Sequence, residues 1–372
     1  MFTLMKYNDT KIPKSMILEI NKTISRHNHP NFIKSIGFLL RDVFISYAIY
    51  SLYHFIKQTF NINSNVLSYF LYIVYSIALG TSLTGIWVLG HECGHGAFGQ
   101  TKWQNDMVGF ITHSALLVPY FSWQYSHNKH HKYTNHLVNG ETHVPSTKKG
   151  MEGLLKVRDI LGDEAFLFIH STTTILLGWP LYLFFYSSGG RTGYDIEKKL
   201  NKSKPVDHFR PWSQIIHPRL YWKVVLSTVG CLSTCGLIWY NNMIVDYIGP
   251  YLVVNSWLII YTLLQHTSSA VPHYGVGTES IYNHTLGALC TIDRPYPWLI
   301  DQLHHHIGTT HVIHHLNYSV PHYHAEKCTK EMKLVLGDRY LYDSTPILTA
   351  LKRVFSDCIY VDSIEGIQYF KK

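Results

Sequence analysis

Histidines gather in three short motifs of this sequence, HECGH, HNKHH and HVIHH. On a helix, residues three and four positions apart share one face, with Cβ atoms roughly 5–6 Å apart. The imidazoles of each motif can therefore converge on a metal ion, and neutral imidazole suits iron, zinc, copper or nickel. The histidines concerned are His91, His95, His127, His130, His131, His311, His314 and His315. Because zinc sites generally use four ligands, this many histidines favours a pair of metals, and iron is the usual metal where O₂ must be activated.

The first motif also allows a different chemistry. The stretch from His91 to His95 matches HExxH, the signature of zinc proteases in which the glutamate is the general base. An intramembrane zinc peptidase would explain this motif but would leave the histidines of the other two motifs without a role. It predicts that Glu92 is essential, whereas an oxidative centre predicts that His130 and His314 are as essential as His91. The histidines whose spacing repeats nothing are interpreted as surface residues or as neighbours of ligands: His136, His143, His208, His217, His322 and His324.

The composition indicates a membrane protein. Hydrophobic residues make up 46% of the chain and aromatic residues 14%, whereas only 15% are charged, against about 25% in ordinary soluble domains. The mean hydropathy of −0.01 excludes a chain made only of membrane spans. The formal charge of +8 is accompanied by no nucleic-acid-binding motif. We therefore expect basic loops that face an anionic membrane surface, and no nucleic-acid partner.

Cysteines and the N-terminus agree with this interpretation. The six cysteines form no CxxC pair, so we expect reduced thiols and no disulfide framework. The N-terminus lacks the apolar segment of a secretory signal. An internal span would then direct the chain to its membrane.

Five long apolar runs could position the histidines, at residues 43–59, 66–90, 165–187, 221–240 and 247–265. A membrane span needs about 20 predominantly apolar residues. The loops 58–65 and 241–246 contain no Lys or Arg, whereas the other connecting segments are basic, and basic loops stay in the cytoplasm. The run 165–187 lies between basic segments and is interrupted by Gly178-Trp179-Pro180. We therefore expect it to be a re-entrant or interfacial helical segment and the other four runs to be spans.

The fold class that follows is an all-α membrane protein with four transmembrane helices and a cytoplasmic, histidine-rich cap. We expect one domain over residues 1–372, in which 1–41 is a cytoplasmic arm and 91–164 and 266–372 form the cap. This topology places both termini and all three histidine motifs in the cytoplasm.

With these motifs the chain resembles the membrane-bound fatty acid desaturases, most closely the delta-12/omega-3 acyl-lipid branch. The resemblance runs from about Gly85 to Val361 and includes linking segments such as LLGWPLYLFF, LLQHTSSAVPHY and GALCTIDR. It implies an oxidoreductase of unsaturated fatty acid biosynthesis, with several spans in the endoplasmic reticulum membrane. Such an enzyme uses two iron ions, O₂ and two electrons to place a double bond in a fatty acyl lipid, which the resemblance favours as phospholipid-linked.

The resemblance also assigns residues. It carries the ligand role over to the eight histidines and implies a ninth ligand, His266 in LLQHT, and a ligand neighbour, His305 in LHHHIG. The spans 66–90 and 247–265, with the run 165–187, would enclose an apolar channel for the acyl chain. Its candidate lining residues are Trp87, Trp179, Trp257 and Tyr261.

Electrons would come from separate proteins, because the chain has no haem-binding HPGG motif. The resemblance implies cytochrome b5 and its reductase as donors. A basic segment would suit an acidic donor, and Lys198, Lys199 and Lys202 form one such segment.

The resemblance leaves the product open. We expect delta-12 desaturation of oleoyl lipid, with omega-3 or bifunctional delta-12/omega-3 desaturation as the alternative. Hydroxylases and acetylenases share the scaffold, and an intramembrane HExxH zinc peptidase is the alternative from another class of enzyme.

Overall fold

The computed structural model describes residues 11–62, 66–189 and 206–372, and it is helical almost throughout. The first half contains α1 (Lys14–Ser25), α2 (Phe32–Thr59), α3 (Val66–His95), α4 (Lys102–Ala115), α5 (Tyr120–Lys132), α6 (Lys148–Leu161) and α7 (Asp163–Phe185). The second half contains η1 (Pro218–Leu220), α9 (Tyr221–Tyr240), α10 (Ile244–His266), α11 (His284–Ala288), α12 (Trp298–Leu303), α13 (His311–Leu316), α14 (His322–Leu336), η2 (Gly337–Arg339) and α15 (Ile347–Asp357). The basic segment with Lys198, Lys199 and Lys202 lies outside the described residues.

The strands that the structure describes are short. Strand β1 (His273–Tyr274) pairs antiparallel with β2 (Ile367–Gln368), so that His273 lies opposite Gln368. This pairing ties the end of the chain to the segment that follows α10. Because the described strands are so short, the all-α fold class predicted from the sequence is confirmed.

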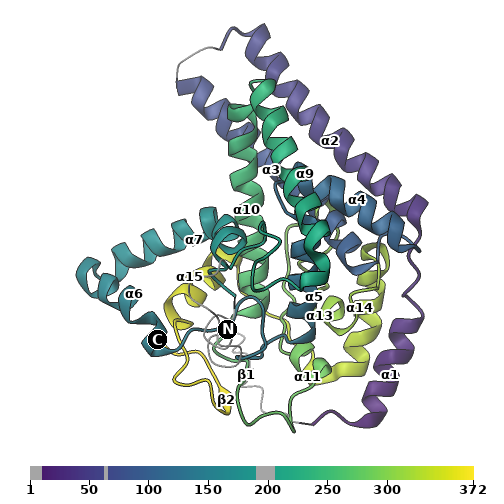
Figure 1. Cartoon of the computed structure of the whole chain (residues 1–372), viewed down its shortest axis with the longest axis vertical. Helices are drawn as coiled ribbons and strands as arrows, with labels where there is room; N and C mark the ends of the chain where they lie inside the picture. The colour runs from purple at the N-terminus through teal and green to yellow at the C-terminus, as the bar shows by residue number, and fades with distance from the viewer. Residues whose placement is uncertain (1–10, 63–65, 190–205) are drawn as a thin grey trace.

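Long helices form a bundle at one end of the molecule (Figure 1), where α3 packs between α2 and α10. The Ser46 and Ser82 hydroxyls hydrogen-bond between α2 and α3 at 2.9 Å. The Trp257 indole N–H donates to Thr81 Oγ1 at 3.0 Å, which joins α10 to α3. Such polar pairs satisfy donors and acceptors that water cannot reach inside an apolar bundle.

A glycine lets α3 and α10 approach each other closely. A Cβ atom on Gly80 would lie 2.5 Å from the carbonyl oxygen of Pro250 and 2.5 Å from Val253 Cβ. Small residues allow this kind of close helix contact in membrane proteins. The contact fixes the helix that carries the first histidine motif against the helix that ends at His266.

Four described helices are long and apolar enough to cross a membrane: α3, the η1–α9 unit (Pro218–Tyr240), α10 and α7. The first three contain the predicted spans 66–90, 221–240 and 247–265. Helix α2 contains the predicted span 43–59 but is not in this set, and it carries Lys34, Arg41, Asp42 and Lys57. Length and composition leave membrane orientation untested, so the cytoplasmic position of the cap stays a prediction.

The predicted interruption of the run 165–187 is wrong. Helix α7 continues without a break from Asp163 to Phe185, with Pro180 inside it. Proline removes one backbone donor and usually kinks a helix, but Trp179 and Tyr182 are buried in the same core as α3 and α10, and this packing holds the helix in place. In Figure 1, α7 crosses α10 instead of running alongside it.

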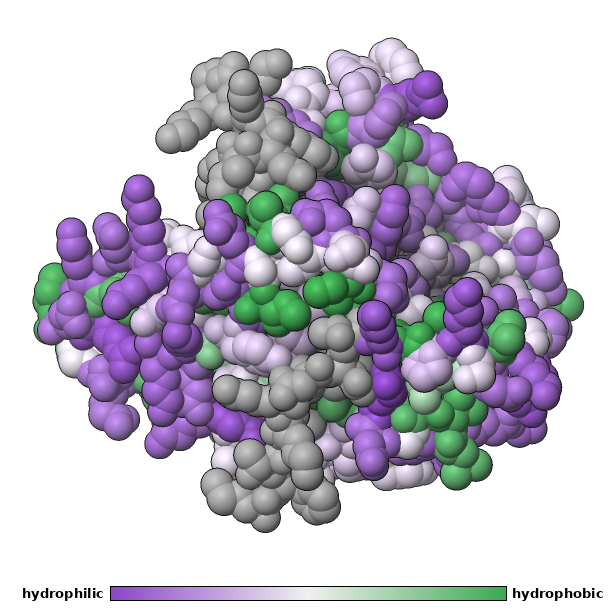
Figure 2. All heavy atoms as spheres, turned by 90° about the horizontal axis from the view of Figure 1, so that it is seen from below, coloured by the Kyte–Doolittle hydropathy of each residue, from purple (hydrophilic) through white to green (hydrophobic). Residues whose placement is uncertain are grey.

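Shorter helices form the cap below the bundle. Figure 1 shows α5, α11, α13 and α14 around the lower end of α3, with α1 packed against α14. Figure 2 shows this end of the molecule, where hydrophilic side chains cover much of the surface between smaller hydrophobic patches. The bundle exposes large apolar side chains such as Phe44, Phe70 and Trp222. This division of polar and apolar surface is what a membrane protein with an aqueous cap requires.

We predict that replacing Gly80 by leucine destabilises the protein, because the new side chain would force α3 and α10 apart. Overpacking of this kind costs about 1–3 kcal/mol. The matched control is Gly236→Leu on α9, where a Cβ atom meets nothing within 4 Å. The thermal midpoint of the detergent-purified protein should fall for Gly80→Leu alone; equal midpoints for both variants would contradict this packing.

Candidate metal centre

The three histidine motifs lie on helices, as their spacing predicts. The first motif is the last turn of α3, the second lies on α5, and the third forms most of the six-residue helix α13. His266 is the last residue of α10. Four helices thus bring nine histidines to one place at the lower end of the bundle.

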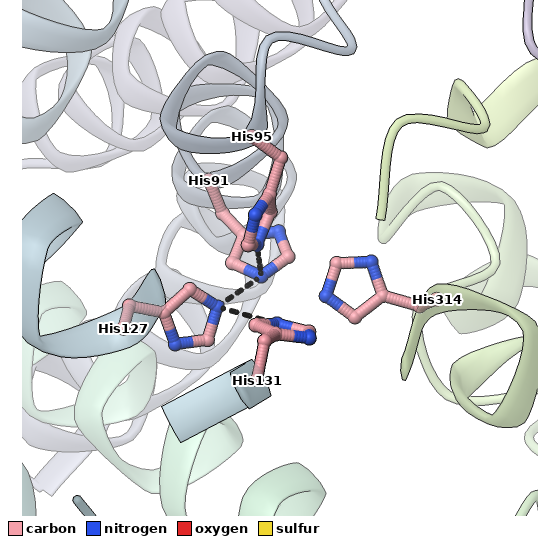
Figure 3. Close-up of side chains that lie close together, drawn as sticks. All are labelled: His91, His95, His127, His131 and His314. Atoms are coloured by element: carbon pink, nitrogen blue, oxygen red, sulfur yellow. Dashed lines mark hydrogen bonds between the residues drawn. The ribbon is translucent and has the colours of Figure 1, made fainter. Parts of the chain in front are cut away.

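Five of these histidines form the first group, shown in Figure 3: His91, His95, His127, His131 and His314. Their potential ligand atoms all lie within 4.8 Å of one another. His91 Nε2 lies 2.9 Å from His127 Nε2 and 3.3 Å from His95 Nε2. His127 Nε2 lies a further 3.2 Å from His131 Nε2. The group therefore combines all three motifs.

The second group adjoins the first. His130, His266 and His315 have ligand atoms within 4.8 Å of one another. His130 Nε2 lies 3.2 Å from His266 Nε2, and His311 Nε2 lies 2.9 Å from that same atom. His131 and His315 stack between the two groups, with ring centroids 4.1 Å apart. All nine histidines proposed from the sequence are thus brought together by the structure.

Burial keeps these imidazoles neutral. Loss of water lowers the pKa of both His130 and His314 to about 3. Burial and the neighbouring histidines hold the pKa of His127 and His131 well below the usual value. At pH 7 each ring therefore presents a lone pair, which is the form that binds metals.

The donor set fits a metal centre better than it fits a network of hydrogen bonds. A neutral imidazole has one N–H donor and one lone pair. His91 Nε2 and His127 Nε2 each face two other Nε2 atoms. Each nitrogen carries either one hydrogen or one lone pair, so it can form only one good hydrogen bond unless its two neighbours share it. The Nε2 atoms of His314 and His315 are buried and form no hydrogen bond within the part of the chain that the structure describes. A metal ion can accept all of these lone pairs together.

Neighbouring side chains orient the ligands. Thr134 Oγ1 lies 3.0 Å from His315 Nδ1, which leaves His315 Nε2 to face the second group. Trp123 stacks on His127, with ring centroids 4.6 Å apart and planes 18° apart. Partners of this kind fix the orientation of a ligand ring.

The short helix α13 needs an anchor outside itself, because six residues have little helical stability of their own. The buried carboxylate of Asp293 accepts a hydrogen bond from the Val312 backbone N–H at 2.9 Å. The Tyr340 hydroxyl donates to the other carboxylate oxygen. Asp293 therefore joins α13 to the segment after α14, and its position in GALCTIDR gave no sign of this role.

Glu92 and His305 lie beside the first group, where they line one small pocket together with His314. The Glu92 carboxylate accepts a hydrogen bond from the His322 backbone N–H at 3.0 Å and belongs to neither histidine group. Its carboxylate therefore faces the start of α14. His305 Nε2 hydrogen-bonds with Asp42 Oδ2 at 2.6 Å, and its ring packs on His322. The structure thus brings His305 against Asp42 and His322, in a small pocket that His314 also lines.

A largely apolar cavity opens beside both groups. Its walls come from α3, α5, α7 and α10, and they include Trp87, Trp179 and Tyr261. Trp257, which we also expected to line a channel, instead hydrogen-bonds to Thr81. Five of the nine histidines reach the cavity: His91, His127, His130, His266 and His311. A chain of methylene groups in this cavity would lie against both groups.

The sequence analysis left His143 either as a surface residue or as a neighbour of a ligand, and the structure places it beside a ligand candidate. His143 lines the same cavity, and its ring lies against that of His266, with centroids 5.6 Å apart. Burial lowers the pKa of His143 to about 4. Its spacing matches no motif, and the loop between α5 and α6 alone brings it to the site.

Comparison with known proteins gives a consistent result. The family model described as "Fatty acid desaturase" matches residues 67–346. The chain is 38% identical over 327 residues to a delta(12) fatty acid desaturase of Mortierella alpina, covering 82% of this chain and 78% of that protein. It is 38% identical over 363 residues to a delta(12)-fatty-acid desaturase of Arabidopsis thaliana, covering 94% and 88%. It is also 37% identical over 350 residues to an oleoyl-12-hydroxylase of Ricinus communis, covering 90% and 84%.

We predict that Asp293→Ala destabilises the protein and loosens α13, because it leaves the Val312 N–H buried without a partner. An unsatisfied buried donor costs about 1–3 kcal/mol. Asp293→Asn retains an acceptor oxygen for the Val312 N–H and should lose less stability. Thermal midpoints and hydrogen exchange of the α13 amides measure the effect, and native-like exchange in Asp293→Ala would show that the carboxylate does not anchor the helix.

Proposed function

The chain belongs to the fatty acid desaturase family and is an oxidoreductase, and we propose that it places a cis double bond at the delta-12 position of oleoyl lipid. The observation that carries this proposal is the apolar cavity whose wall includes histidines of both groups. A saturated methylene has no acidic proton, so the protein must place it within reach of an oxidising centre and exclude water. The aromatic walls of the cavity would do both.

We propose that two iron ions occupy the two histidine groups, and that the ligands are the nine histidines His91, His95, His127, His130, His131, His266, His311, His314 and His315. Bound iron would supply the O₂-dependent oxidation that an unactivated C–H bond requires. The nine rings offer only neutral nitrogen donors, held by four helices. Their burial and the stacked tryptophans would keep water away from the reacting carbons.

The reaction removes one hydrogen from each of two neighbouring methylenes. With O₂, two electrons and two protons, it releases two molecules of water for each double bond formed. We propose that cytochrome b5 and its reductase supply the electrons, as the resemblance to desaturases implies.

A surface hollow supports electron entry beside the first group. Tyr318 is partly buried, and its ring lies 4.7 Å from the His95 ring and 5.2 Å from the His131 ring, measured between centroids. Two surface hollows meet at this ring, and Tyr318 and Asn128 line both of them. A donor bound there would be separated from the first group by one aromatic ring.

Position and product are proposed from the relatives. Most of the relatives described above are named for delta-12 chemistry, and an omega-6 desaturase of Brassica juncea, 37% identical over 360 residues, is named for the endoplasmic reticulum. We therefore propose an oleoyl substrate and an endoplasmic reticulum enzyme. The sequence resemblance favours a phospholipid-linked substrate, and the basic loops favour a cap that faces the cytoplasm. The similarity to an oleoyl-12-hydroxylase favours hydroxylation as the second candidate.

We predict that His130→Ala and His131→Ala each lower the iron content of the purified protein. These neighbours on α5 belong to different groups, so each variant should fall from about two iron ions per chain to about one or fewer, as expected when a direct ligand is lost. The control is His29→Ala, at an exposed position between α1 and α2. Elemental analysis per chain measures the result, and wild-type iron in both variants would contradict the ligand assignment.

We predict that a yeast lacking polyunsaturated fatty acids makes linoleate when it expresses this chain. Gas chromatography of its lipids measures the product, and His314→Ala should abolish it. A product that appears only when linoleate is fed would show omega-3 activity in place of the proposed delta-12 activity. A hydroxy acid would show that the enzyme is a hydroxylase. No new fatty acid from well-expressed, iron-loaded protein would contradict the proposed reaction.

A further inference from the structure

The two histidine groups differ in size among the described residues. The first group has five members, whereas the second has three, with His311 joined to it through the 2.9 Å contact with His266 Nε2. The second group is therefore one nitrogen donor short of the first. Iron accepts up to six donors, so this difference leaves room for a further protein ligand at the second site.

His143 lies on the side of the second group. Its ring is nearly parallel to that of His266, with planes 12° apart. It lines the apolar cavity together with His130, His266 and His311. Both the cavity and the ring of His266 thus border the imidazole of His143.

The loop that carries His143 is held in a strained conformation. The backbone of His143 has φ +54°, the left-handed region that non-glycine residues rarely adopt. Contacts of the two preceding residues hold the loop: Glu141 pairs with Lys129 of the second motif at 3.0 Å, and Thr142 hydrogen-bonds with Ser188 at 2.9 Å. Strain held by neighbouring contacts is a frequent property of functional sites. Here it directs an imidazole into a cavity that is otherwise largely apolar.

We propose that His143 is a tenth histidine of the metal centre, which supplies a ring nitrogen to the second group. The proposal rests on the proposed function, because it requires metal at that group. The alternative is that His143 only packs against His266. A phenylalanine at this position would preserve packing but remove both nitrogens, so the two roles can be separated.

The test is the rate at which iron leaves the purified, full-length protein when a strong chelator is added. His143→Phe and His143→Ala should each release one of the two iron ions at least tenfold faster than the wild type, and His143→Gln, which retains a polar donor, should release it at an intermediate rate. The control is His29→Phe, which should behave as the wild type. Size-exclusion profiles and helical circular dichroism confirm that each variant is folded.

The outcomes separate this proposal from the function it rests on. If His143→Phe releases iron as slowly as the wild type while His143→Ala releases it faster, His143 acts by packing and the proposal is wrong. Wild-type rates in all variants would also overturn it. If the wild-type protein itself binds no iron, the proposed di-iron function fails, and the tenth ligand fails with it.

Discussion

Nine uncharged imidazoles converge in a buried space, and this convergence constrains the rest of the structure. Lone pairs that face each other at about 3 Å favour a cation between them, and the rings have no water to turn towards. The surrounding helices must therefore hold the rings in one arrangement, which suits metal binding better than hydrogen bonding. Each helix that carries a histidine of the site also packs against other helices of the bundle or the cap.

Contacts between residues that are distant in the sequence hold these helices in place. Gly80 lets α3 and α10 approach, and this contact brings the end of each helix, and so His95 and His266, to the same level. Asp293 fixes the short helix α13 from a different segment of the chain. The cavity lies where α3, α7 and α10 meet the cap, so one set of contacts shapes both the centre and the cavity that we propose for the acyl chain.

The sequence predicts those features that depend on local spacing. The three histidine motifs and the apolar runs require only helical periodicity and length, and the structure has helices at each of them. His266 was found through resemblance alone, because a single histidine carries no spacing signal. Asp293 escaped prediction, and the place of His143 stayed open between the surface and the neighbourhood of a ligand, because the path of the loops that carry them is set by tertiary contacts. The break predicted at Pro180 failed because packing of Trp179 and Tyr182 outweighs the local preference of proline.

Anomalous diffraction at the iron edge from crystals of the purified protein tests the account most directly. We expect two iron peaks in each chain, one among His91, His95, His127, His131 and His314, and one among His130, His266, His311 and His315. A single peak, a peak of another metal, or iron located away from these histidines would contradict the account.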